Sequence, residues 1–312
     1  MTTDTARRGG IRLGDRVFAG SAATAGALIL IVLAAVAVFL IAQSLPALGA
    51  GPGELPGTAQ NFWVYVWPLV FGTIWSAFLA LLVATPLSIG IALFISHYAP
   101  RRLAQALGYV IDLLAAVPSV VFGLWGIVVL APFVQPMYSW LVANLGWIPL
   151  FAGPVSGTGR TVLTASVVLA VMVLPIMTAI CREVFLQAPR LHEEAALALG
   201  ATRWEMIRMA VLPFARAGIV SAIMLGLGRA LGETMAVAMV LSPALVVNMF
   251  LLTSINPNTI AANIALQFPE ATGVSVNALI ASGLVLFLVT LGINMIARYI
   301  VGRRRAFSGA NA

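Results

Sequence analysis

Residues 161–181 read TVLTASVVLAVMVLPIMTAIC and contain no charged side chain. At about 1.5 Å per residue, a helix of this length crosses a hydrocarbon core about 30 Å thick. Predominantly apolar stretches of similar or greater length lie at 18–42, 68–96, 106–132, 214–241 and 275–301. The sequence therefore predicts an all-α, polytopic membrane protein with six transmembrane helices.

The composition of the whole chain agrees with this prediction. Of the 312 residues, 61% are hydrophobic and 9% are charged, and the mean hydropathy is +1.04. Soluble domains carry about a quarter charged residues, so a water-soluble globule and a disordered chain are excluded. The single Cys181 excludes an internal disulfide and a cysteine-based metal cluster. His97 and His192 are far apart in the sequence, and no metal site is expected.

The first apolar stretch resembles a secretory signal, because four arginines precede it and Gly49, Ala50 and Gly51 follow it. A signal peptide has an apolar region of about 7–15 residues, whereas this one is longer, so we interpret it as a retained helix. The predicted organisation is a tail at 1–17, a first helix and external loop at 18–67, a transmembrane domain at 68–301, and a tail at 302–312.

The positions of the arginines predict the orientation. The 17 basic residues are all arginines, and most fall at the N-terminus, in the loops 97–105 and 182–216, and at the C-terminus. A six-span arrangement places these four segments on one side, while the opposite connections 43–67 and 242–274 are nearly uncharged. By the positive-inside rule, both termini are cytoplasmic in a bacterial plasma membrane. This asymmetry accounts for the net charge of +7 without nucleic acid as a partner.

The longest predicted cytoplasmic loop contains signals for two short helices. Residues 188–213 read APRLHEEAALALGATRWEMIRMAVLP. Pro189 suits a first helical turn, Gly200 suits a helix stop, and Thr202 and Glu205 have the spacing of a capping box. We expect a helix, a glycine turn and a second helix that ends at Pro213. From these residues alone, a solvated amphipathic connector is an equally good interpretation.

The fifth apolar stretch contains a pair of charged residues. Residues 226–236 read GLGRALGETMA, with Arg229 and Glu233 four positions apart. On a continuous helix this spacing places both on one face, where they can form an ion pair. An arginine inside a membrane costs about 2.5–3.5 kcal/mol on insertion scales and needs a partner or a wet cavity. The pair either fixes helix packing or acts on an anion, with the carboxylate restraining the guanidinium group.

Other residues in the apolar stretches have simpler interpretations. Asp112 is expected to pair with an arginine of a neighbouring element, and Pro118 and Pro175 are expected to kink their helices. Small residues at every fourth position favour close helix packing. They form two rows, Gly218, Ala222, Gly226 and Ala230, and Gly228, Gly232 and Ala236.

Three segments resemble known transport proteins. The pattern Glu194-Ala195-Ala196, Gly200 and Leu212-Pro213 resembles the EAA loop of ABC importer permeases, although Ala210 stands where that family usually has isoleucine. GLGRALGETMAV at 226–237 and DLLAAVPSVVFGLWG at 112–126 resemble the PstC-type permease subunits of phosphate importers. The resemblance covers most of residues 70–300.

The resemblance implies a type I ABC importer permease fold and a role as a permease subunit rather than an enzyme. It implies a PstA-like homologous permease, two copies of a PstB-like ATPase and a PstS-like phosphate-binding protein as partners. This chain would bind no cofactor, and ATP and Mg²⁺ would be used by the ATPase. Arg229 and Glu233 would serve phosphate passage. The residues implied in ATPase coupling are Glu194, Ala195, Ala196, Gly200, Thr202, Glu205, Leu212 and Pro213.

Three alternatives remain open at this point. The chain could be an ABC permease for another oxyanion, such as sulfate or molybdate, against which the 226–237 string argues. It could be an ATP-independent secondary transporter or channel, against which the EAA pattern argues. It could also be a purely structural membrane subunit.

Overall fold

The computed structural model describes residues 13–57 and 59–305. Arg7, Arg8 and Arg12 of the predicted N-terminal tail therefore lie outside the described residues, as does most of the C-terminal tail. Among the described residues, six helices are long and apolar enough to cross a membrane, which confirms the predicted number. They cover 14–48, 62–98, 119–145, 162–186, 203–231 and 274–299.

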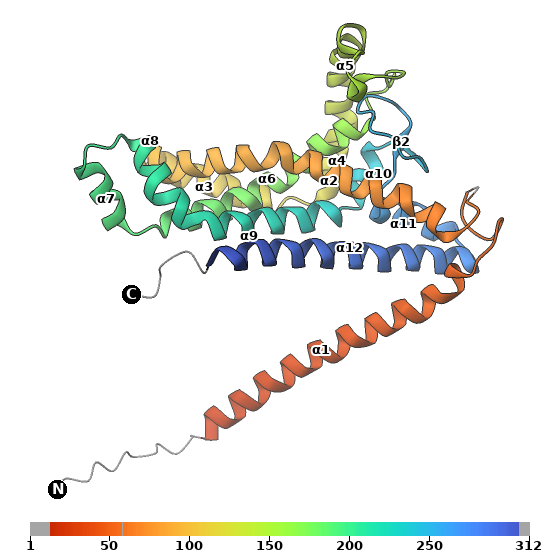
Figure 1. Cartoon of the computed structure of the whole chain (residues 1–312), viewed down its shortest axis with the longest axis horizontal. Coiled ribbons are helices and arrows are strands. Elements are labelled where there is room, and N and C mark those ends of the chain that lie inside the picture. Colours follow the sequence, from red (N-terminus) through yellow and green to blue (C-terminus); the bar gives the residue numbers. More distant parts are fainter. Residues whose placement is uncertain (1–12, 58, 306–312) are drawn as a thin grey trace.

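Three helices form the centre of the bundle, namely α2 (Phe62–Leu93), α6 (Val162–Leu186) and α9 (Leu212–Leu231). Figure 1 shows them running side by side. The backbones of α6 and α9 approach closely, because a Cβ at Gly218 would lie 2.5 Å from Val184 and one at Gly226 would lie 2.6 Å from Met177. The first predicted row of small residues thus packs against α6. Pro175 lies inside α6, which continues through it.

The first helix, α1 (Leu13–Leu48), diverges from this bundle (Figure 1). Its most apolar stretch has no buried residue. It contacts α12 (Val274–Arg305), where the side-chain amide of Asn277 donates to the carbonyl of Gln43 at 2.7 Å and to its side-chain oxygen at 3.1 Å. The helix extends beyond the predicted 18–42 at both ends.

The predicted third span, 106–132, is wrong in its position. The chain forms α3 (Arg101–Ala115), breaks, and continues as α4 (Ser119–Trp125), the π-turn η2 (Gly126–Leu130) and α5 (Ala131–Leu145). Pro118 causes the break, because it restricts the residue before it and cannot donate a helical hydrogen bond. It therefore begins a new helix instead of kinking one. Asp112 is exposed on α3 and forms no ion pair with any described residue.

The predicted fifth span, 214–241, also has different bounds. The helix begins earlier, as α8 (Arg203–Met206) and the π-turn η4 (Ile207–Val211), and runs on into α9. Pro213 does not end a helix, because it lies in the first turn of α9. The preceding residue, Leu212, donates its N–H to the Ile207 carbonyl and so connects the π-turn to α9. Near the other end, residues 232–234 interrupt the helix before α10 (Met235–Val240).

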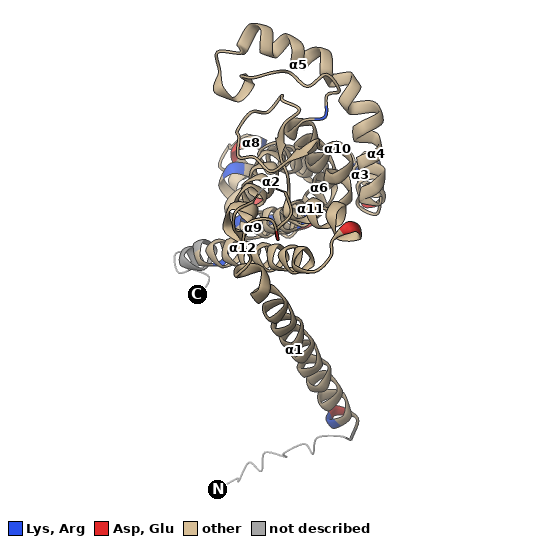
Figure 2. Cartoon of the chain, turned by 90° about the vertical axis from the view of Figure 1, so that its right-hand side faces the viewer, with Lys and Arg blue, Asp and Glu red and all other residues tan. Residues whose placement is uncertain are grey.

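The end of the molecule opposite α8 is built from short elements. β1 (Pro243–Ala244) pairs in parallel with β2 (Asn256–Pro257), and α11 (Ile260–Gln267) and the 3₁₀ turn η5 (Phe268–Glu270) follow; another 3₁₀ turn, η3, spans Pro149–Phe151. The buried Asn256 side chain accepts from the Val162 N–H at 2.9 Å and donates to the carbonyls of Arg160 and Ser242. Figure 2 views this end, which carries few charged side chains.

A close approach between α2 and the backbone that follows β2 leads to a stability prediction. A Cβ at Gly72 would overlap the backbone carbonyl of Asn258, whereas one at Gly90 in the same helix would meet no atom within 4 Å. Gly72→Ala should therefore destabilise the protein by about 1–3 kcal/mol, the usual cost of overpacking. Thermal unfolding of the detergent-solubilised complex measures this effect. Gly90→Ala is the matched control, and equal melting temperatures for the two variants would contradict the packing.

Candidate functional site

The loop between α6 and α9 has the local structure that its sequence predicts. The helix α7 (Arg190–Ala198) begins directly after Pro189 and ends at Ala198, and the turn that follows it contains Gly200 with a φ of +85°. Gly200 donates to Leu197 at 3.0 Å and Ala201 donates to Ala196 at 3.2 Å, which together satisfy the last carbonyls of the helix. Glycine suits this turn because a Cβ strains the left-handed conformation.

The capping box at the start of α8 is also confirmed. The Glu205 carboxylate accepts from the Thr202 backbone N–H and hydroxyl, each at 2.8 Å, and the Thr202 hydroxyl accepts from the Glu205 N–H at 3.3 Å. These hydrogen bonds stabilise the ionised carboxylate and lower the pKa of Glu205 below its ordinary value. The ionised carboxylate therefore stabilises the start of α8 at neutral pH, and this stabilisation is lost as the pH falls through the lowered pKa.

One side of this loop packs on the bundle and the other side is exposed. Ala196 and Ile207 are buried, and the imidazole Nε2 of His97 lies 3.7 Å from the Glu193 carboxylate, an ion pair when the histidine is protonated. On the outer side, Glu194 and Ala195 are exposed. Leu199 is 90% exposed and Trp204 is 56% exposed. The loop therefore presents an apolar surface with charged neighbours at one end of the bundle.

The predicted ion pair between Arg229 and Glu233 is not formed. Arg229 lies in the last turn of α9, is exposed, and forms no hydrogen bond or ion pair with any residue that the structure describes. Glu233 lies after the helix has ended and is 7% exposed. Its carboxylate accepts from the Ala236 N–H at 3.1 Å. Because the helix stops at Leu231, the spacing of four residues no longer places the two side chains on one helical face.

Glu233 is one of two charged side chains that satisfy the backbone of α10. At the other end of this helix, the Nη2 of Arg160 donates to the carbonyls of Met239 at 3.1 Å and Leu241 at 3.0 Å. A carboxylate at a helix N-terminus and a guanidinium at its C-terminus both complement the helix dipole. Sequence reasoning assigned no role to Arg160, because its partners lie far along the chain.

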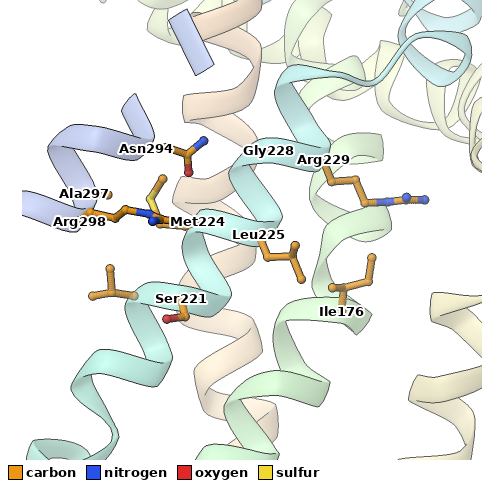
Figure 3. A pocket seen from close by; sticks show the side chains of 10 residues that line it. Ile176, Ser221, Met224, Leu225, Gly228, Arg229, Asn294, Ala297 and Arg298 are labelled. Atoms are coloured by element: carbon orange, nitrogen blue, oxygen red, sulfur yellow. The ribbon is translucent and has the colours of Figure 1, made fainter. Parts of the chain in front are cut away.

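A cavity of about 950 Å³ lies along the exposed face of α9. Figure 3 shows Arg298 extending from α12 toward α9 near Met224, while Arg229 extends on the other side of α9. The second predicted row of small residues does not pack here, since a Cβ at Gly228 would meet no atom within 4 Å. The lining residues are Ile176, Val220, Ser221, Met224, Leu225, Gly228, Arg229, Asn294, Ala297 and Arg298.

The charge of this cavity suits an anion. The described residues that line it include two arginines and no acidic residue, and a guanidinium group presents a planar set of donors that matches an oxyanion. The described part of the chain contains no group of three or more His, Cys, Asp or Glu side chains that could hold a metal ion. Sequence reasoning identified Arg229 but not Asn294 or Arg298, which are 65 or more positions farther along the chain.

Comparisons with known sequences identify the family of the chain. Residues 84–306 match the family model described as "Binding-protein-dependent transport system inner membrane component". The proteins named "Phosphate transport system permease protein PstC 2" of Mycobacterium bovis and Mycobacterium tuberculosis are each 46% identical over 301 residues, 93% of this chain and 93% of theirs. The protein named "Phosphate transport system permease protein PstC" of Mesorhizobium japonicum is 39% identical and covers 96% of this chain and 93% of its own.

A comparison with solved structures identifies the same fold. A chain of a bacterial ABC transporter involved in the import of the acidic polysaccharide alginate aligns with a TM-score of 0.59, covering 93% of this chain and 96% of its own, at 18% sequence identity. That likeness shows the fold of an ABC importer permease. Together with the family match, it identifies the chain as a multi-pass membrane subunit and not an ATPase. The chain belongs to the binding-protein-dependent transport system inner membrane components, the permease subunits of ABC importers.

Proposed function

We propose that this chain is the permease subunit of an ATP-driven importer of inorganic phosphate. The observation that carries the proposal is the unpaired Arg229 guanidinium on the exposed face of α9, where it lines the cavity. Relatives that span almost the whole chain are named phosphate transport permeases, which supports this substrate.

The position of Arg229 constrains what covers α9. Arg229 lies in the last turn of α9, two residues before the end of the membrane-crossing helix 203–231. A guanidinium group without a partner is costly to hold in hydrocarbon and is stabilised by a water-filled cavity. The exposed face of α9 therefore lies toward a wet pathway, which a PstA-like homologous permease closes from the opposite side. Arg229 attracts phosphate into this pathway through hydrogen bonds between its guanidinium group and the phosphate oxygens.

The loop with α7 couples transport to ATP hydrolysis. Two copies of a PstB-like ATPase, which bind ATP and Mg²⁺, engage this loop and the corresponding loop of the second permease. Glu194, Ala195 and the exposed Leu199 form the contact surface, and Gly200, Thr202 and Glu205 fix its shape. Both termini lie in the cytoplasm, and a PstS-like binding protein delivers phosphate to the opposite face.

Uptake of labelled phosphate and sulfate by transporter-deficient cells tests the proposed substrate and the role of Arg229. Cells that express this chain with its partner subunits should accumulate phosphate in preference to sulfate. Arg229→Gln should lower phosphate uptake about ten- to hundredfold, since a hydrogen bond to a charged group contributes about 1.5–3 kcal/mol. Arg216→Gln is the matched control, because Arg216 is exposed on the same helix outside the cavity. Sulfate uptake without phosphate uptake would overturn the substrate assignment.

Substitutions of Glu233 separate its hydrogen bond from its charge. Glu233→Gln keeps an oxygen acceptor for the Ala236 N–H and should retain stability and most phosphate uptake. Glu233→Ala removes this acceptor and should destabilise the complex by about 0.5–2 kcal/mol, the cost of losing a comparable side-chain hydrogen bond at a helix N-terminus. Thermal unfolding and uptake at matched abundance measure both effects. If Glu233→Gln alone abolished uptake in a stable complex, the negative charge itself would act on the anion or on Arg229.

Substitutions of Gly200 test the coupling loop. Proline cannot donate to Leu197 and fixes φ near −65°, so Gly200→Pro should leave the protein in the membrane but uncouple ATP hydrolysis from uptake. Asparagine tolerates a positive φ, so Gly200→Asn should retain most of the coupling. Hydrolysis and phosphate uptake are measured together in proteoliposomes. Normal transport by the Gly200→Pro variant would contradict the assignment.

A further inference from the structure

The cavity along α9 contains a second basic group that the proposed phosphate pathway has not used. Arg298 lies on α12 and forms no hydrogen bond or ion pair with another described residue. The side chain extends toward α9 (Figure 3), where Ser221 and Met224 lie. Arg229 is eight residues beyond Ser221, which corresponds to about 12 Å along the helix. The two guanidinium groups are therefore separate positions in one cavity.

Asn294 lies one helical turn from Arg298 on the same face of α12 and lines the same cavity. One N–H of its amide donates to the Thr290 carbonyl at 2.9 Å, which leaves the second N–H without a partner among the described residues. The Ser221 hydroxyl, in contrast, donates to the Ala217 carbonyl of its own helix at 3.0 Å. The free donors at this position thus come from α12. Ser221 lies beside them but has no free donor of its own.

We infer that Arg298 and Asn294 form a second binding site for a phosphate-type oxyanion, separate from Arg229 and nearer the end of the bundle that carries α7. The inference rests on the proposed function, since it extends the path of the same anion. Between the two arginines the cavity is lined by Met224 and Leu225, which cannot donate to an oxyanion. A second cationic site lowers the barrier that this apolar section presents to the anion.

The same donors suit a free phosphate ion and the phosphate of a lipid headgroup, so the test must separate these sources. Ser221→Cys places a thiol in the cavity, and the native Cys181 is fully buried and gives little background. In the complete complex, dissolved in a maltoside detergent, this thiol should react faster with an anionic methanethiosulfonate than with a cationic one. Inorganic phosphate should slow the reaction several-fold.

The control variants show whether Arg298 carries this effect. Arg298→Gln should remove both the preference for the anionic reagent and the protection by phosphate, whereas Arg298→Lys should keep the preference. Arg208→Gln removes an exposed arginine that does not line the cavity and should change neither. If phosphate protected the thiol equally well in the Arg298→Gln variant, the inferred site would be wrong.

The same protection measurement in nanodiscs identifies the source of the anion, and comparison with uptake separates this inference from the proposed function. In nanodiscs, protection by phosphatidylglycerol alone would assign the site to a lipid headgroup, and protection by inorganic phosphate would assign it to the free ion. Failure of both to protect would overturn the site. If Arg229→Gln abolished phosphate uptake while Arg298→Gln left the protection of the thiol unchanged, the proposed function would stand and the second site would be wrong. If Arg298-dependent protection of the Ser221→Cys thiol were seen in a complex that imports no phosphate, the second site would stand and the proposed function would be wrong.

Discussion

The short helix α10 depends on two charged side chains, one at each of its ends. Hydrocarbon offers no partner to the backbone groups that a helix break exposes, so they must be satisfied inside the protein. Here the Glu233 carboxylate accepts from the N-terminus of α10, and the Arg160 guanidinium donates to its C-terminal carbonyls. The break after α9 is stable because of these contacts, and they join it to the segment that leads into α6.

The use of Glu233 at this break changes the electrostatics of Arg229. An arginine paired with a carboxylate on one helical face would be largely neutralised and would attract an anion weakly. Because the carboxylate is held by the backbone of α10, the positive charge of Arg229 is left uncompensated among the described residues. Arg229 is exposed and joins α9 to no other described helix, so its charge does not serve packing. The free donors of its guanidinium group instead favour a role in binding an anion, and no acidic residue is among the described residues that line the cavity.

The features predicted correctly from the sequence are those encoded by neighbouring residues. The six apolar helices follow from hydropathy, and the turn at Gly200 and the capping box of Thr202 follow from local hydrogen bonding. The two helix breaks were not predicted, for different reasons. Pro118 was interpreted as a kink in a continuous helix. Residues 232–234 contain no proline, and their hydropathy averages with that of the apolar residues on both sides. Arg160 and Met239 are 79 positions apart, and no local pattern could connect them.

The continuity of the helix from α8 to α9 connects the loop that contains α7 directly to the cavity. Residues 203–231 form one helical path, interrupted only by the widened turn at Ile207–Val211, so the capping box and Arg229 lie at opposite ends of a single element. The Leu212 N–H donates to the Ile207 carbonyl in this turn, so backbone hydrogen bonding continues through it. On the proposed function, an ATPase that displaced α7 would shift α9 with it, while Glu233 and Arg160 hold α10 in place. Such a shift would change the position of Arg229 relative to the helix break and thereby the access of the anion to it.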